Sequence, residues 1–227
     1  TLTYSGEEQT VLTVPEGADT YYTMSGEDKA TDVGEYTITL RLNEGYVWPD
    51  GTETDKTIQW KIQPMKVKAP AAVTGLIYNG ETRTGVAAGE GCTLESEFKA
   101  VNAGEYTAVA KLTNTANYQW DDGTTEDKTI VWSIGEKTPA VSDFAVTYPR
   151  SEDLVYDGNA KEVTAELSDS YPAQDITLTV VYTNADGIAV EEPTNADTYT
   201  VKLCVSGSSN FAAAELALND LTIVPMG

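Results

Sequence analysis

Apolar and polar residues alternate along much of this chain. Between Tyr36 and Leu42 every second residue is apolar, and the residues between them are threonine or arginine. A period of two is typical of a β-strand with one buried face. Similar alternation occurs at 58–62, 106–112, 130–134, 176–180 and 199–205. We therefore predict an all-β chain, and the abundance of threonine, valine, tyrosine and glycine agrees with strands joined by turns.

One short pattern occurs three times: a turn, then a tyrosine, then an alternating strand. The copies are Asp-Val-Gly-Glu-Tyr-Thr at 32–37, Asn-Ala-Gly-Glu-Tyr-Thr at 102–107 and the looser Asn-Ala-Asp-Thr-Tyr-Thr at 195–200. We call them the first, second and third corners. The first two corners also share a Tyr-x-Gly turn before them and a tyrosine, a tryptophan and an acidic hairpin after them. Repetition at a spacing of roughly 70–80 residues predicts a tandem array of similar domains.

The repeat predicts three domains, at 1–67, 68–138 and 139–227, the first with its N-terminal strand truncated. The joints between them, at 63–70 and 135–139, are short and contain proline. Proline fixes one backbone angle and lacks an N–H, so we expect stiff joints across which strand pairing is not continuous. The third domain is the longest and the most divergent, and Asp197 stands where the other corners have glycine.

The corners resemble the tyrosine corner of immunoglobulin-type sandwiches, in which a tyrosine at the start of strand F bonds back to the backbone. The corresponding residues here are Tyr36, Tyr106 and Tyr199. The resemblance implies that these tyrosines are structural. Antibody domains have cysteine two residues further on, whereas these corners have isoleucine, alanine and valine. We expect no inter-sheet disulfide, and Cys92 and Cys204 lie in different predicted domains.

The first two predicted domains are also similar to a repeat of bacterial surface proteins. In the second domain the resemblance rests on Tyr-Asn-Gly at 78–80, the corner at 102–107, Tyr-Gln-Trp at 118–120 and Asp-Lys-Thr-Ile-Val-Trp-Ser-Ile at 127–134. The third domain resembles a related repeat named for its Tyr-Asp-Gly motif, here at 156–158, but lacks the tryptophans. The family implies immunoglobulin-like β-sandwiches that act as stalks in extracellular, cell-wall or secreted proteins, without common catalytic residues. A small β-grasp-like fold for each module is the alternative.

We therefore expect a non-catalytic spacer that presents other domains of the same polypeptide or contributes to adhesion. Two alternatives remain: a module that binds glycans or host surface proteins, and an accessory region of a large extracellular enzyme. The chain has no histidine. This removes the usual zinc sites and serine triads, and leaves neither cysteine with a histidine to activate it. No enzymatic activity is expected.

The four tryptophans divide into two pairs. Trp60 and Trp132 lie on alternating stripes beside isoleucines, so we predict that they are core residues. Trp48 and Trp120 lie next to turns. An aromatic ring at the edge of a sandwich can stack on a sugar, which makes these two the candidate ligand-binding residues.

The acidic hairpin of the second domain is the candidate metal site. Its carboxylates are Asp121, Asp122, Glu126 and Asp127. Calcium, a hard cation, binds several such oxygens. The spacing does not match an EF-hand loop, and Asp-Gly is also a common turn pair. Calcium is the one cofactor we consider. The alternative interpretation is that these residues only form a turn.

The chain is strongly acidic, with 36 acids, 14 bases and a formal net charge of −22. The acids are spread along the chain, although the third predicted domain alone carries 14 of them against 3 bases. Such a surface repels nucleic acid and anionic membranes and favours colloidal solubility. No apolar run of 18 residues occurs. We expect neither a nucleic-acid partner nor membrane insertion within this chain.

Overall fold

The computed structural model describes residues 1–227 and confirms the prediction of an all-β chain. Strands contain 44% of the residues and helices 4%, and none of the sheets is closed. None of the helices has the length and apolar character needed to cross a membrane. The chain divides into two compact units, which are described separately. Unit 1 comprises Thr1–Ala71, Ala87–Ser96 and Ala108–Ile130, and unit 2 comprises Ala72–Val86, Glu97–Thr107 and Val131–Gly227.

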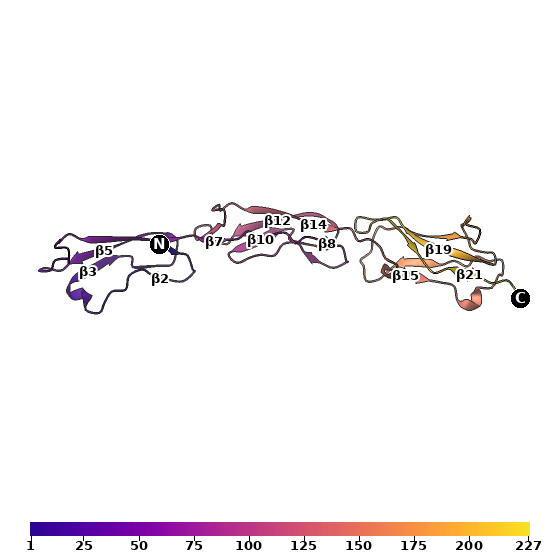
Figure 1. Cartoon of the computed structure of the whole chain (residues 1–227), viewed down its shortest axis with the longest axis horizontal. Coiled ribbons are helices and arrows are strands. Elements are labelled where there is room, and N and C mark those ends of the chain that lie inside the picture. The colour runs from indigo at the N-terminus through magenta and orange to yellow at the C-terminus, as the bar shows by residue number, and fades with distance from the viewer. The chain divides into compact units, whose positions relative to one another are not determined.

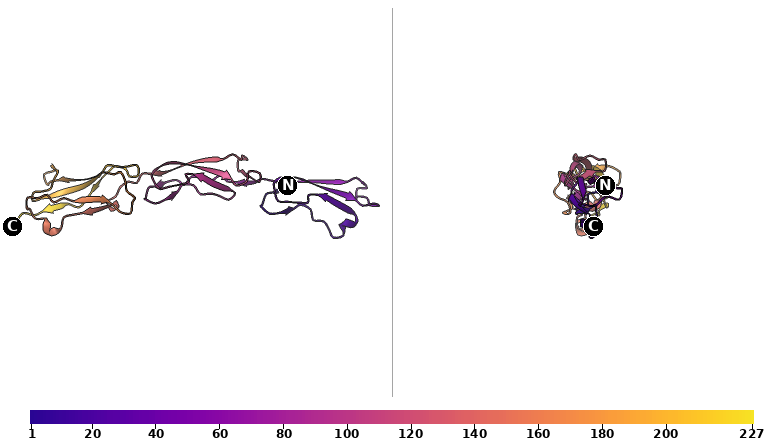
Figure 2. Two further views of the ribbon diagram at one scale, coloured as in Figure 1. Left: turned by 180° about the vertical axis from the view of Figure 1, so that it is seen from behind. Right: turned by 90° about the vertical axis from the view of Figure 1, so that its left-hand side faces the viewer.

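In unit 1 the first corner leads into the centre of a four-stranded sheet (Figure 1). Its order is β1 (Leu2–Thr3), β6 (Lys56–Gln63), β5 (Gly34–Leu42) and β3 (Tyr22–Gly26). β5 pairs antiparallel with β6 and β3. β1 runs parallel to the end of β6, so the N terminus lies beside that end, as Figure 2 also shows. The alternating stripes bury Ile38, Trp60 and Ile62 together, as predicted for Trp60.

Further strands of unit 1 lie outside this sheet. They are β2 (Gln9–Thr10), paired with β4 (Lys29–Ala30), and β10 (Cys92–Ser96), paired with β12 (Gly104–Leu112). A short 3₁₀ helix, η1 (Ala18–Thr20), precedes β3. A second buried cluster contains Val67, Cys92, Ala110, Leu112 and Trp120. The Cys92 thiol is therefore part of a core.

The joint at 63–70 contains a short strand of its own, separated from β6 by Pro64. It contains β7 (Met65–Val67), which pairs in parallel with β13 (Tyr118–Trp120). Proline removes only its own N–H, so Pro64 leaves the following residues free to form a ladder. The N–H of Met65 donates to the Asn117 carbonyl at 2.9 Å, and the N–H of Asp121 donates to the Val67 carbonyl at 3.0 Å.

Unit 2 contains a counterpart of the first sheet's edge. β8 (Leu76–Ile77) runs parallel to the end of β14 (Lys128–Gly135), as β1 does to β6. β9 (Arg83–Thr84) pairs with β11 (Lys99–Ala100). In unit 1 the antiparallel pair β10–β12 repeats the pair β3–β5. The second corner leads into β12 as the first leads into β5.

Trp132 of β14 packs against Gly85, a position where no larger residue fits. The ring is 3% exposed, which confirms the prediction that it is a core residue. A Cβ added to Gly85 would lie 1.8 Å from the indole ring, far inside van der Waals contact. The indole N–H donates to the Glu97 carbonyl at 2.6 Å, which fixes the ring in its plane.

The third corner leads into β19 (Asp197–Val205), the central strand of the rest of unit 2. The sheet order is β18 (Ala189–Val190), β17 (Leu178–Thr183), β19 and β20 (Ala214–Ala217), and β21 (Leu221–Ile223) also pairs with β19. β15 (Phe144–Thr147) and β16 (Thr164–Leu167) form a separate pair. Two 3₁₀ helices flank β15, η2 (Val141–Asp143) and η3 (Ser151–Asp153), and η3 lies near the C terminus in Figures 1 and 2.

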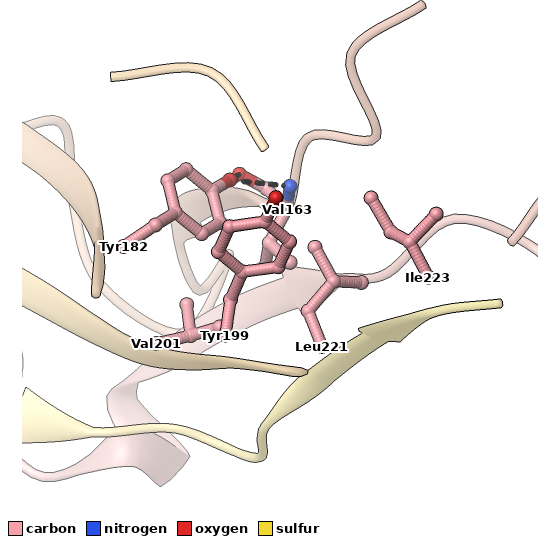
Figure 3. Packing of buried hydrophobic residues seen from close by; sticks show 6 residues of the cluster. All are labelled: Val163, Tyr182, Tyr199, Val201, Leu221 and Ile223. Atoms are coloured by element: carbon pink, nitrogen blue, oxygen red, sulfur yellow. Dashed lines mark hydrogen bonds between the residues drawn. The ribbon is translucent and has the colours of Figure 1, made fainter. Parts of the chain in front are cut away.

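A buried cluster lies where β17, β19 and β21 meet (Figure 3). Its residues are Val163, Tyr182, Tyr199, Val201, Leu221 and Ile223. The Tyr182 hydroxyl makes two hydrogen bonds to the backbone of Val163. It accepts from the Val163 N–H at 2.7 Å and donates to the Val163 carbonyl at 3.3 Å. Leu203 and Val205 continue the β19 stripe into a neighbouring cluster with Phe144.

Candidate functional site: the corners and the joints

Each corner tyrosine bonds to the backbone four residues before it. The Tyr36 hydroxyl donates to the Asp32 carbonyl at 2.7 Å, Tyr106 to the Asn102 carbonyl at 2.7 Å and Tyr199 to the Asn195 carbonyl at 3.0 Å. These bonds hold the turn against the strand that follows it. Burial, followed by the nearby carboxylates of Asp32 and Glu27, raises the pKa of Tyr36.

In the first two corners the tyrosine ring lies on a core tryptophan. The Tyr36 and Trp60 ring centroids are 4.7 Å apart with the planes 31° apart, and those of Tyr106 and Trp132 are 4.8 Å apart at 29°. The cross-strand register accounts for the first contact, because Tyr36 and Trp60 face each other directly across β5 and β6. The corner is thus fixed by a hydrogen bond at its tip and a ring contact at its base.

An asparagine side chain closes the first corner from another part of unit 1. The Val33 N–H donates to Asn117 Oδ1 at 2.9 Å, and Asn117 Nδ2 donates to Asp32 Oδ1 at 2.7 Å. Asn117 is 3% exposed. Its own carbonyl accepts from the Met65 N–H. We call this set of bonds, together with the β7–β13 ladder, the first joint.

The same arrangement recurs in unit 2 at the second corner. The Ala103 N–H donates to Asn210 Oδ1 at 2.7 Å, and Asn210 Nδ2 donates to Asn102 Oδ1 at 3.1 Å. The Asn210 carbonyl accepts from the Lys137 N–H at 2.8 Å, and Lys137 forms a parallel bridge with Phe211. We call this the second joint. The two side-chain bonds to the corner and the bond to the asparagine carbonyl match those of the first joint, while the backbone pairing is a single bridge in place of a ladder.

Sequence reasoning missed both asparagines. Each lies directly before an aromatic residue, as Asn117-Tyr118 and Asn210-Phe211, and this recurring pair was the available signal. The first predicted domain has Gly45-Tyr46 at the equivalent place, which hid the pattern. The partners are also remote: 84 and 107 residues separate the bonded groups. No local pattern can indicate such a contact.

An aromatic cluster packs beside each asparagine. At the second joint the rings of Tyr78, Tyr171 and Phe211 lie within contact, with centroid separations of 5.2 to 6.0 Å. At the first joint Tyr4, the counterpart of Tyr78, meets Tyr118 edge-on at 5.3 Å. Burial and a hydrogen bond to the Asp143 carboxylate raise the pKa of Tyr171 to about 12. The joints therefore combine the hydrogen bonds of a buried asparagine with apolar contact between aromatic rings.

A buried lysine follows the third Tyr-x-Gly turn, Tyr156-Asp157-Gly158. Lys161 is 8% exposed, and its ammonium donates to Asp157 Oδ2 at 2.9 Å. Asp157 Oδ1 also accepts from the Asn159 N–H at 2.9 Å. These bonds, Lys161 first, lower the pKa of Asp157 to about 2. The Lys161 N–H donates to the Pro193 carbonyl just before the third corner, which ties the turn to the corner.

The two candidate sugar-binding tryptophans differ in exposure. Trp120 is 1% exposed, so a sugar could stack on it only if the ring were uncovered. Trp48 is half-buried and lies 5.8 Å from the Tyr22 ring. Each indole N–H donates to a hairpin carbonyl at 2.8 Å, from Trp48 to Thr54 and from Trp120 to Glu126. In the structure both residues close their hairpins.

The acidic hairpin residues have separate protein partners. Asp122 accepts from the Thr124 N–H and hydroxyl and from Lys128 Nζ at 2.6 Å, and the Lys128 bond in particular holds its pKa well below the usual range. Glu126 accepts from the Thr125 N–H, and Asp127 pairs with Lys111 at 3.5 Å. Asp121 is exposed. No group of three potential ligands that could hold a metal ion is formed. Asp50, Thr52 and Lys56 repeat the Asp122 pattern in the first hairpin.

A shallow hollow of about 280 Å³ lies beside the first corner. It is lined by Thr1, Glu35, Tyr36, Thr37, Gln59, Trp60 and Lys61. The lining combines aromatic rings with a carboxylate, an amide and an ammonium, which is a set of groups that can contact a sugar. Sequence reasoning did not single out this place.

No family model matches the sequence, and no curated protein matches it. Among solved structures, the chain is similar to an endo-fucoidan hydrolase from glycoside hydrolase family 107, with 10% sequence identity and a TM-score of 0.21. The match covers 97% of this chain and 39% of the hydrolase chain. A likeness at this level carries no argument about function.

Proposed function

We propose that this chain is a non-catalytic spacer of a bacterial cell-surface or secreted multidomain protein. It would consist of three immunoglobulin-like β-sandwich modules that present other domains or contribute to adhesion. One observation carries the proposal: in each of the two joints an asparagine makes the same pair of bonds to a corner, beside a parallel backbone pairing. A repeated, ordered joint is what a spacer requires, because its spacing must not fluctuate.

The joints are built to resist bending. A flexible Gly/Ser linker leaves neighbouring modules free to rotate, whereas here side-chain and main-chain bonds both cross the junction. Each such bond contributes on the order of 1 kcal/mol net, and the buried asparagine leaves corner groups unsatisfied if it is withdrawn. The aromatic contacts Tyr4–Tyr118 and Tyr78–Phe211 add apolar area.

The module type is supported by the corners and the strand pairing. All three tyrosines make the bond that defines a tyrosine corner, and the pairs β10–β12 and β8–β14 repeat β3–β5 and β1–β6. The location outside the cell is supported by the resemblance of the sequence to bacterial surface repeats.

Small-angle X-ray scattering of the full chain tests the spacer proposal. We expect an elongated particle whose largest dimension stays constant between low and high salt. The variant carrying both Asn117→Ala and Asn210→Ala should remain folded by circular dichroism but show a broader distribution of dimensions. A compact wild-type particle would exclude a spacer.

The second candidate function is glycan or host-protein binding. It is favoured by the half-buried Trp48 and by the hollow beside Tyr36 and Trp60. A glycan array probed with the full chain, repeated with Trp48→Ala and Trp120→Ala, tests it. Binding that is lost in a folded variant supports this function. The third alternative, an accessory region of a large enzyme, requires a catalytic domain elsewhere in the same gene.

A further inference from the structure

The third corner has the geometry of a corner that receives an asparagine. The Tyr199 hydroxyl bonds to the Asn195 carbonyl, as in the first two corners. Asp197 pairs with Ile223, as Gly34 pairs with Ile62. The two groups that would bond the asparagine are the Asn195 side chain and the Ala196 N–H, and both residues are exposed. The counterparts of Ala196 in the other corners, Val33 and Ala103, are half-buried.

The chain that leaves the last strand also repeats the first joint. Ile62 is followed by Gln-Pro-Met, and Ile223 is followed by Val-Pro-Met. In the first joint this methionine, Met65, begins β7 and donates its N–H to the asparagine carbonyl. Met226 is the equivalent residue and is 65% exposed, whereas Met65 is half-buried. The apolar side chain at 226 therefore lacks the cover that its counterpart has.

We propose that Asn195, Ala196 and Pro225-Met226 form the receiving half of a further joint. Its partner is a β-module, attached after Met226, that presents an asparagine immediately before an aromatic residue at the start of a strand. This inference rests on the proposed spacer function and names the partner that such a spacer would carry.

The chemistry of the corner selects asparagine. One group of the partner must accept from the Ala196 N–H while a neighbouring atom donates to Asn195 Oδ1. An amide offers both in a fixed fork, whereas an aspartate cannot donate. Asn195 matches Asn102 of the second joint, where the same fork is filled by Asn210.

The charge around the third corner adds to the specificity. Asp197 replaces the glycine of the other corners, and Glu191 and Glu192 lie just before the corner. The replacement accompanies a different backbone angle: Gly104 has a φ of +153°, which side chains rarely adopt, whereas Asp197 does not have a positive φ. The added carboxylates favour a partner loop that carries lysine or arginine.

The test uses the full chain with a graft. Residues 66–138 are repeated directly after Met226, so that a second copy of Asn117 follows the third corner at the spacing of the first joint. Amide hydrogen exchange of Ala196 is then measured by NMR, with the 1–227 chain as reference. We expect about tenfold slower exchange in the extended chain, because the N–H enters a hydrogen bond. Changing the grafted asparagine to alanine should restore fast exchange.

Three results would overturn the proposal. They are unchanged Ala196 exchange beside a folded graft, protection that survives the alanine change, and protection that rises with protein concentration, which indicates contact between molecules. If the graft does not fold, a copy of 138–227 placed after Met226 brings the Asn210-Phe211 pair instead and decides the question. Scattering gives the independent readout of the spacer function, so a compact particle with a protected Ala196 would reject the function and leave the joint standing.

Discussion

At the scale of single residues, the corners depend on hydroxyl and amide groups that satisfy the backbone. Tyr106→Phe removes one hydroxyl and leaves the Asn102 carbonyl without that donor. We expect the unfolding free energy to fall by about 1 kcal/mol, measured by urea denaturation. Tyr21→Phe is the control, because Tyr21 is 54% exposed and its hydroxyl can bond to water. Equal stability of the two variants would remove the structural role of the Tyr106 hydroxyl.

The ion pair between the exposed Asp157 and the buried Lys161 makes stability depend on pH. The folded pKa of Asp157, about 2, lies below the ordinary value of about 3.9 for aspartate. The pair therefore stabilises the fold above about pH 4, and this contribution is lost as the pH falls through 2. Asp157→Asn should lower the melting temperature at pH 7 and flatten its fall between pH 4 and pH 2.

The matched control for this titration is Asp186→Asn, since Asp186 lies exposed in a turn. It should leave both the melting temperature at pH 7 and the acid slope close to those of the wild type. An Asp157→Asn variant that shows the wild-type slope would contradict the assignment.

At the scale of strands, Gly85 and Trp132 form one packing unit. Gly85→Ala should destabilise the chain by about 1–3 kcal/mol, because the added methyl must displace an indole that is fixed by its own hydrogen bond. Trp132→Ala should cost about 3–5 kcal/mol through the cavity it leaves. The two changes share one space, so the double variant should be more stable than the sum of the single losses predicts. Simple additivity in urea denaturation would count against the contact.

Strand positions could be predicted from the sequence because alternation is a local property. The stripes through Ile38 and Val201 appear as buried faces. The linker strand β7 could not be predicted, because three residues after a proline show no alternation and their partner lies far along the chain. The joint asparagines were missed for the same reason. The difference in exposure between Trp48 and Trp120 could not be predicted from the sequence either, because both residues occupy the same position relative to a hairpin.

At the scale of the whole molecule, the two joints differ in one charge. Asn117 donates to the carboxylate of Asp32, whereas Asn210 donates to the neutral amides of Asn102 and Gln174. Asn117→Asp places two carboxylates within hydrogen-bond distance and should lower the unfolding free energy by about 2 kcal/mol or more. Asn210→Asp should cost about 1 kcal/mol less, because the neighbouring amides can rotate to donate.

The dependence of stability on ionic strength distinguishes charge repulsion from steric effects in these two variants. The excess loss in Asn117→Asp should shrink between low and high salt, although only in part because the site is largely buried, while that of Asn210→Asp should stay constant. Calorimetric scans at two salt concentrations would measure both. Equal losses in the two variants would mean that the carboxylate of Asp32 does not face the asparagine in solution.

The parallel pairing of β7 with β13 has a mechanical consequence. Tension on the chain at this joint acts along β7, whereas the ladder bonds run across it. The load is therefore shared by the whole ladder in shear, and the strand cannot be peeled away one bond at a time. A short strand of three residues thus works as a clamp whose rupture force exceeds that of the same number of bonds pulled apart in sequence.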